Sequence, residues 1–321
     1  MSNDKSNPPL DEQTKEWLAN LEDLGEERGY FEPLGANHFA VLTDAAPTLV
    51  VTFETIQSIH ANSPDNLPLG FDLVANNGWS HLGIIANGDT WFRDKSVYGY
   101  LDRLVDDGFF EDFDQVIFIG SGMCGYAAAA FSVVSPGCTV LIYSPQATLD
   151  PRVTEWDHRF GKMRRTSFTD RYGYAPDMIE AADQVFVFYD PEEEMDAMHA
   201  ALFTRPHVTK LRCRYLGAQV LQSMIGMDIL HPLLDTAVKR GNVAQHFYGL
   251  FRARHNHLVY LRRLLMQLNG SNRLMLSGLL CRHVTSHMKA PRFRRRLAEV
   301  ESQLADLGRA LPSPKNTDAP E

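Results

Sequence analysis

The middle of the chain alternates between short apolar segments and longer amphipathic ones, and this alternation limits the possible folds more than any other feature. The short segments, bounded by turn residues, are expected to be strands, and the segments with helical spacing are expected to be helices. Strands separated by crossover helices form a mostly parallel sheet covered on both faces, a doubly wound α/β fold. The predicted strands are 115–119, 139–143, 184–189 and 208–215, and the predicted helices are 123–134 and 192–203.

Three earlier apolar segments are predicted to be the first strands of the same sheet. They span residues 38–42, 49–53 and 81–86, each bounded by turn residues. After them, Asp94 is a favourable N-cap for an amphipathic helix, and Gly108 is placed to end that helix. The alternation of strand and helix therefore extends through most of the first 215 residues.

Charge is distributed unevenly along the chain. Of its 31 Lys and Arg residues, 13 lie within residues 251–321 with only 5 of the 40 Asp and Glu, so residues 1–250 are strongly acidic. No strand pattern occurs after residue 230, whereas four segments there have helical spacing. We therefore predict a disordered amino terminus over 1–13, an α/β domain over 14–229, a basic helical extension over 230–310 and a disordered tail over 311–321.

Several features favour a cytoplasmic protein. The amino terminus is polar and lacks the apolar core of a signal peptide, and the longest weakly apolar run, 126–134, is far too short to span a bilayer. The four cysteines are widely spaced without a Cys-x-x-Cys pair, so reduced thiols are expected. The 12 histidines show no metal-binding spacing. We expect neither a metal site nor a cofactor.

A glycine-rich turn follows the predicted strand 115–119 and opens the predicted helix 123–134. One pattern for such a place is the nucleophile elbow, Gly-x-Ser-x-Gly, in which small residues lie two places either side of an exposed nucleophile. Because Gly120 directly follows the strand, the nucleophile position falls on Gly122 and the second small position on Cys124. Glycine has no side chain, so this alignment disfavours a working serine hydrolase.

Two neighbouring residues are alternatives for the missing nucleophile. With Ser121 in that role, Ile119 and Met123 would stand where the turn needs small residues. The Cys124 thiol would have its pKa lowered by the helix amino terminus, but it lies half a turn into the helix and also fits a small packing residue. The candidate ligand-binding residues of the turn are Gly120, Ser121, Gly122, Met123, Cys124 and Gly125.

The same turn matches a second pattern, Gly-x-Gly-x-x-Gly, through Gly120, Gly122 and Gly125. In dinucleotide-binding proteins these glycines let a pyrophosphate approach the backbone at a helix amino terminus. The next predicted strand, however, ends in Ser144-Pro-Gln146, without the acidic residue that binds an adenosine ribose. A dinucleotide-binding enzyme is therefore an alternative interpretation of the turn.

In a hydrolase with this elbow, the triad acid and base follow later strands of the sheet. Asp190 follows such a strand, but Asp190-Pro191 also fits a helix N-cap with proline in the first turn, and we favour the N-cap. The base position, after the next strand, falls on Ala218, and the first histidine beyond it is His231. The sequence therefore places no base in the triad.

A basic segment lies near the carboxyl terminus. It spans residues 282–296 and contains Arg292, Arg294, Arg295 and Arg296. Such a cluster neutralises polyanions, but no nucleic-acid-binding motif accompanies it. The segment is expected to dock on the acidic body of the same chain or on an anionic partner.

Longer stretches of the sequence carry a family resemblance. Gly120-Ser-Gly-Met-Cys-Gly-Tyr-Ala-Ala-Ala-Ala-Phe-Ser-Val-Val-Ser-Pro-Gly137, with Ser144-Pro-Gln-Ala-Thr-Leu-Asp-Pro151, resembles α/β-hydrolase-like proteins of proteobacteria, whose active relatives have Gly-x-Ser-x-Gly-Gly at the turn. With Leu24-Gly-Glu-Glu-Arg-Gly-Tyr-Phe-Glu-Pro33 and Arg171-Tyr-Gly-Tyr-Ala-Pro-Asp-Met178, the chain resembles an alphaproteobacterial group that often carries the name phosphoadenosine phosphosulfate reductase. The resemblance covers most of residues 15–260 and implies an α/β-hydrolase-like fold.

The reductase name implies a nucleotide-sulfate reductase with a Ser-Gly-Gly-x-Asp-Ser phosphate loop and a cysteine in a Glu-Cys-Gly-Leu-His context, and the sequence contains neither. The leading hypothesis is a degenerate α/β-hydrolase-fold protein without Ser nucleophile or His base, which binds a small molecule or a protein partner without catalysis. The alternatives are a dinucleotide-binding enzyme, a hydrolase or acyltransferase with an unconventional nucleophile, and the reductase that the name implies.

Overall fold

The computed structural model describes residues 10–45, 47–75 and 77–313. The predicted disordered ends, 1–13 and 311–321, lie mostly outside these residues. At the amino end, helix α1 (Glu12–Arg28) begins before the predicted domain boundary at residue 14, because the side chain of Asp11 accepts a hydrogen bond from the Thr14 N–H at 2.7 Å and caps the helix.

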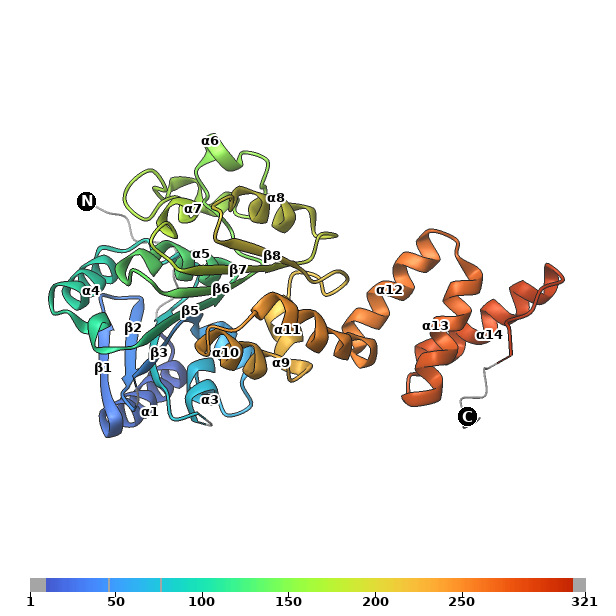
Figure 1. Ribbon diagram of the computed structural model, residues 1–321, viewed down its shortest axis with the longest axis horizontal. Helices are drawn as coiled ribbons and strands as arrows, with labels where there is room; N and C mark the ends of the chain where they lie inside the picture. Colours follow the sequence, from blue (N-terminus) through green and yellow to red (C-terminus); the bar gives the residue numbers. More distant parts are fainter. Residues whose placement is uncertain (1–9, 46, 76, 314–321) are drawn as a thin grey trace. The chain divides into compact units, whose positions relative to one another are not determined.

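Eight strands form one sheet in the order β1-β2-β4-β3-β5-β6-β7-β8 (Figure 1). The β1–β2 and β2–β4 pairs are antiparallel, and all other neighbouring pairs are parallel. The predicted doubly wound, mostly parallel sheet is confirmed. The strands are β1 (Gly29–Leu34), β2 (His38–Thr43), β3 (Thr48–Thr55), β4 (Ser80–Ala86), β5 (Gln115–Ser121), β6 (Thr139–Tyr143), β7 (Gln184–Tyr189) and β8 (Val208–Arg212).

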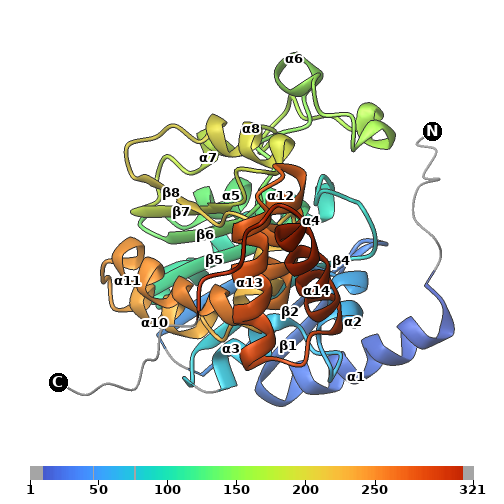
Figure 2. The same cartoon turned by 90° about the vertical axis from the view of Figure 1, so that its right-hand side faces the viewer.

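Helices cover both faces of the sheet. In both views α5, α7 and α8 lie on one side, and α1 and α3 lie on the other (Figures 1 and 2). The inner strands β2 to β7 are largely apolar on both faces, as expected of a parallel sheet between two helix layers. The helices of this part are α2 (Ile56–Asn62), α3 (Leu69–Ala75), α4 (Lys95–Asp106), α5 (Met123–Phe131), α6 (Pro151–Thr154), α7 (Ala175–Met178), α8 (Glu194–Leu202), α9 (Val220–Gly226), α10 (Leu230–Val238) and α11 (Val243–Leu250).

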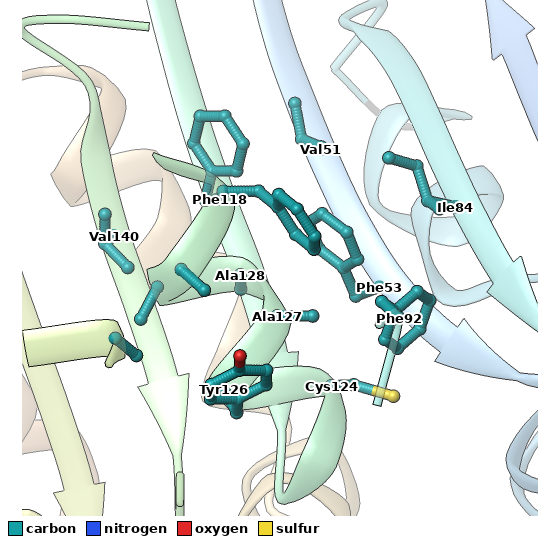
Figure 3. Close-up of a cluster of buried hydrophobic side chains, with 14 of the residues drawn as sticks. Val51, Phe53, Ile84, Phe92, Phe118, Cys124, Tyr126, Ala127, Ala128 and Val140 are labelled. Carbon is teal, nitrogen blue, oxygen red and sulfur yellow. The ribbon is translucent and has the colours of Figure 1, made fainter. Parts of the chain in front are cut away.

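The larger core lies between the sheet and α5 (Figure 3). Ala127 to Ala130 are fully buried, and such small side chains let the helix approach the strands closely. At the end of α5, the Phe131 ring stacks on Phe53 of β3 with 5.6 Å between ring centroids. This packing fixes where the amino end of α5 sits relative to the end of β3.

Two strands and one helix differ from the prediction. β1 was not predicted, because Glu32 and Pro33 interrupt its apolar pattern; as an edge strand it tolerates proline. The predicted strand 208–215 ends as β8 at Arg212, and Tyr215 has a left-handed φ of +68° that no strand accommodates. The predicted helix 123–134 ends as α5 at Phe131 and continues as a single 3₁₀ turn.

The chain divides into two compact units, one ending at Gly249 and the other beginning at Leu250. The first unit therefore includes α10 and most of α11, which the sequence analysis assigned to the extension beginning at 230. The second unit has its own small core around Leu261, Cys281 and Phe293. Within the described residues, no helix combines the length and apolarity needed to cross a bilayer. The helices of the second unit are α12 (Leu258–Gly270), α13 (Leu274–His287) and α14 (Pro291–Asp306).

Candidate functional site

The turn after β5 is as sharp as a nucleophile elbow. Gly122 forms its apex with φ +59° and ψ −125°, a backbone conformation that favours glycine. The Gly122 N–H donates to the Tyr143 carbonyl at 2.9 Å, which ties the apex to the end of β6. Helix α5 begins at the next residue, so the N–H groups of its first turn point out of the helix end. The apex itself supplies only backbone atoms.

Close packing between β5 and α5 accounts for the other two glycines of the turn. A Cβ on Gly120 would lie 2.1 Å from the Cys124 carbonyl oxygen, and a Cβ on Gly125 would lie 3.2 Å from both Gly120 and Pro145. The chain after β6 continues through Ser144-Pro145-Gln146 and brings no carboxylate to the turn. The geometry therefore explains these glycines without a bound pyrophosphate.

Cys124 is the second residue of α5 and is 7% exposed. Burial raises the pKa of its thiol well above the usual range, and the nearby carboxylates of Glu54 and Asp89 raise that pKa further. The lowering of its pKa expected from the helix amino terminus is therefore wrong, because desolvation outweighs the helix dipole. A thiol in this state is a poor nucleophile near neutral pH.

Asp190 follows β7 and is fully buried. Its Oδ2 accepts a hydrogen bond from the Gly217 N–H at 2.6 Å, and its Oδ1 accepts one from the Glu192 N–H at 3.0 Å. The hypothesis that Asp190 caps α8 is wrong, since that helix begins at Glu194 with Glu193 as its N-cap. Both carboxylate oxygens instead hold neighbouring backbone in place.

Ala218 directly follows Gly217, and its methyl group is exposed to solvent. The three predicted triad positions, Gly122, Asp190 and Ala218, all follow the carboxyl ends of parallel strands and lie along one edge of the sheet. Further backbone hydrogen bonds tie this edge together, from Ser144 N–H to the Phe188 carbonyl and from Cys213 N–H to the Tyr189 carbonyl, both at 2.7 Å.

A cavity of about 330 Å³ opens at the same edge, at the carboxyl ends of β3 and β5. Strand order reverses between these two strands, since β4 lies on the far side of β3 and β6 on the far side of β5. Open α/β sheets bind ligands at this kind of switch point. The walls combine the end of β3, the turn at 119–124, the α2–α3 region and helix α9.

Glu54, near the end of β3, is the acidic group deepest in the cavity wall. Both of its carboxylate oxygens lie 3.0 Å from the Leu69 N–H, and the Thr52 hydroxyl donates to Oε1 at 3.1 Å. Burial raises the pKa of Glu54 to about 7, against the opposing effect of the hydrogen bonds from Leu69 and Thr52. Glu54 therefore exchanges a proton near neutral pH.

Glu54 was not among the site residues expected from the sequence. The available signal was a glutamate directly after the buried strand segment 49–53, where the sheet edge collects ligand-binding groups. Thr52 also contacts His81 of β4, with 2.8 Å between Oγ1 and Nε2, and burial lowers the pKa of His81 to about 3. This histidine is neutral and supports Thr52 from within the sheet.

No family model matches the sequence, and no curated protein matches it. Among solved structures, the chain is similar to the capsule O-acetyltransferase of Neisseria meningitidis serogroup A, with 12% identity, a TM-score of 0.40 and coverage of 62% of this chain and 93% of that one. Alpha/beta hydrolase domain-containing protein 10 from mouse gives 11% identity, a TM-score of 0.39 and coverage of 65% and 98%. Carboxyl esterase 2 from Tuber melanosporum has 13% identity and a TM-score of 0.34, with coverage of 68% of this chain and 82% of that one.

The fold is α/β-hydrolase-like. The mostly parallel sheet and the sharp turn between β5 and α5 establish this, as the resemblance implied.

A second polar cluster of this α/β-hydrolase-like unit is structural. His199 of α8 approaches Asp157 with 3.0 Å between Nε2 and Oδ2, and Arg159 joins Asp157 to Asp196 at 2.8 and 2.6 Å. The His199 Nδ1 accepts from the Ala147 N–H at 3.1 Å, so both ring nitrogens have partners. The network fastens the segment after β6 onto α8. Among the described residues, no three His, Cys, Asp or Glu side chains are grouped to hold a metal ion.

Proposed function

We propose that this chain is a non-hydrolytic protein that binds a small molecule in the cavity at the ends of β3 and β5. The observation that carries the proposal is the apex of the elbow, where Gly122 has the sharp backbone conformation of the turn and no side chain. Acyl transfer through a covalent intermediate needs a nucleophile with a general base within hydrogen-bond reach. The exposed methyl group of Ala218 and the backbone-bonded carboxylate of Asp190 support the absence of such a relay.

The cavity supports the binding role. Its volume of about 330 Å³ lies within the range of small-molecule sites, and its walls mix apolar and polar side chains. Phe53, Leu221 and Ile225 are among the apolar side chains, and Ser58 and Gln222 are among the polar ones. A ligand there would contact the turn at Ser121 and the free N–H end of α5 at Met123.

The composition of the walls disfavours nucleotides as ligands. Among the described residues that line the cavity, none is Lys, Arg or His, whereas Glu54, Asp72 and Asp89 are acidic. Phosphate and sulfate groups are usually bound by cationic side chains or by several converging N–H groups. This supports the binding hypothesis over both the dinucleotide-binding enzyme and the nucleotide-sulfate reductase.

Two assays on one preparation test the proposal. A fluorophosphonate probe and short acyl esters should give no labelling and no turnover above a heat-denatured control. A fragment library screened by thermal shift should give ligands that raise the melting temperature by mass action. Labelling of Ser121 or Cys124 together with ester turnover would overturn the proposal.

A matched pair of variants locates the binding site. Ile225→Trp fills the cavity from α9, where Ile225 is 39% exposed, and should abolish the thermal shifts. Val105→Trp places the same side chain on α4, where Val105 is 46% exposed and outside the cavity, and should leave them intact. Equal shifts in both variants would show that the ligands bind elsewhere.

A further inference from the structure

The charges around the β3–β5 cavity are all of one sign. Glu54 lies in the wall, partly buried, and the exposed carboxylates of Asp72 on α3 and Asp89 in the β4–α4 loop lie at its rim. No described lining residue is cationic. A cavity with this lining attracts positive charge and repels anions.

Glu54 keeps capacity for a further partner. Among the described residues, its Oε2 accepts a hydrogen bond only from the Leu69 N–H, whereas each carboxylate oxygen accommodates about two donors. A donor that enters the cavity can therefore bind this oxygen without displacing Thr52 or Leu69. The geometry leaves acceptor capacity on a residue that lines the cavity.

Beside Glu54, the Cys124 thiol also lines the cavity. It is 7% exposed and neutral, and it makes no hydrogen bond to another described residue. Phe53 and Leu221 complete an apolar surface next to these two groups. The site therefore offers one carboxylate, one weakly polar thiol and an apolar wall, a combination suited to a cationic head on an apolar body.

We propose that the ligand of this cavity is an organic amine whose ammonium group pairs with Glu54 and whose apolar part packs against Phe53, Leu221 and Ile225. This inference rests on the proposed binding function and specifies its ligand class. An organic cation is favoured over a metal ion, because no three potential metal ligands are grouped among the described residues. It is favoured over a quaternary cation because the remaining acceptor capacity of Oε2 can bind an N–H donor, which a quaternary cation lacks.

The proposal predicts a pH dependence of binding. Glu54 is neutral below its pKa of about 7 and ionised above it, so affinity for an ammonium ion should rise as the pH passes from about 6 to about 8. The titratable groups that face Glu54 are Asp72, Asp89, Cys124 and, through Thr52, His81. The buried Cys124 thiol and His81 imidazole stay neutral in this window, so the rise should report on Glu54.

Calorimetric titration with matched probes tests the ligand class. The probes are tryptamine, phenethylamine and cyclohexylmethylamine, each with the corresponding alcohol and carboxylate of similar shape. Charge-assisted pairing predicts that an amine binds about tenfold or more tightly than its alcohol, and that the carboxylates do not bind. Glu54→Gln should remove this preference and the pH dependence, whereas Glu111→Gln, an exposed glutamate outside the cavity, should change neither.

The outcomes separate the two proposals. Alcohols or carboxylates that bind as tightly as amines, with binding abolished by Ile225→Trp, would overturn the amine assignment and keep the binding function. Absence of binding by all probes and by the fragment library would overturn the binding function itself. If Glu54→Gln does not fold, the comparison of amine with alcohol on the wild-type protein at the two pH values decides alone.

Discussion

Two places along the sheet's carboxyl edge, one at the outer strands β7 and β8 and one at the central strands β3 and β5, contrast sharply. At the β7–β8 end, Asp190 is fully buried and both its oxygens accept backbone N–H groups, and the neighbouring base position is an exposed alanine. At β3 and β5, Glu54 faces a cavity, keeps a free acceptor site and has a pKa of about 7. The Asp190 carboxylate accepts hydrogen bonds from the backbone, and the Glu54 carboxylate keeps acceptor capacity for a ligand.

The contrast teaches that carboxylates at one edge of a sheet can differ in role, one holding backbone in place and the other, on the proposed function, meeting a ligand. A fully buried carboxylate whose two oxygens both accept backbone N–H groups stabilises a loop. The turn at Gly122 directly follows β5 beside the cavity, and its apex is held to β6 by a backbone hydrogen bond. The account therefore predicts structural consequences from changes at Asp190 and binding consequences from changes at Glu54.

The largest expected effect is on stability at the β7–β8 end. Asp190→Ala leaves the N–H groups of Gly217 and Glu192 without their acceptor in a buried place, which should lower the free energy of unfolding by about 3 kcal/mol. Urea unfolding measures this, with Asp114→Ala, an exposed aspartate at the opposite edge, as the control expected within about 0.5 kcal/mol of wild type. A loss below about 1 kcal/mol would show that Asp190 does not hold this loop.

A smaller effect is expected from the titration of Glu54. Its pKa rises from the ordinary 4.5 to about 7 on folding, so the folded state holds this proton more tightly than the unfolded state. The resulting stabilisation is complete below pH 4.5 and is lost as the pH rises through 7. From pH 4.5 to above pH 7, the free energy of unfolding of the wild type should fall by about 2 kcal/mol relative to that of Glu54→Gln. This figure allows for the partial exposure of the carboxylate.

The free energies of unfolding of the wild type and of Glu54→Gln, measured from pH 4.5 to above pH 7, test the prediction. Glu111→Gln provides the control, because this exposed residue should give a constant difference from wild type. A constant difference for Glu54→Gln as well would mean that the proton on Glu54 is not linked to folding.

The smallest expected effect comes from restoring a hydroxyl at the turn. Gly122→Ser should cost about 1 kcal/mol, because serine disfavours φ +59°, while the nearest atom to its Cβ, Gln146 Oε1, lies 3.8 Å away and leaves room. Labelling by a fluorophosphonate probe should stay at background, since Ala218 supplies no base. Gly161→Ser, in open space, is the control for stability. Strong labelling of Gly122→Ser would reveal a base that the account lacks.

Much of the fold follows from local patterns. Asp94 caps α4 as predicted, with its side chain accepting from the Ser96 N–H, and Gly108 adopts a left-handed φ of +71° after the helix. The buried strands were predictable because both of their faces are apolar. The pairing of β1 with β2 was not, because an edge strand with Glu32 and Pro33 lacks that signal.

The candidate site was only half predictable. The turn at Gly122 is local in sequence, so its lack of a side chain could be inferred directly. The cavity combines residues near Glu54 with residues of α9 around Leu221, and only the folded sheet with its helices brings these together. The role of Asp190 was misassigned for the same reason, because its partner Gly217 is distant in sequence.

Hydrogen–deuterium exchange, followed by mass spectrometry with and without the tightest-binding amine, tests the central contrast most directly. The account predicts slower exchange in peptides that cover 52–63 and 119–125, which line the cavity, and unchanged exchange in peptides that cover 213–219. Protection of 213–219 without protection of 52–63 would place the ligand at the β7–β8 end and contradict the account.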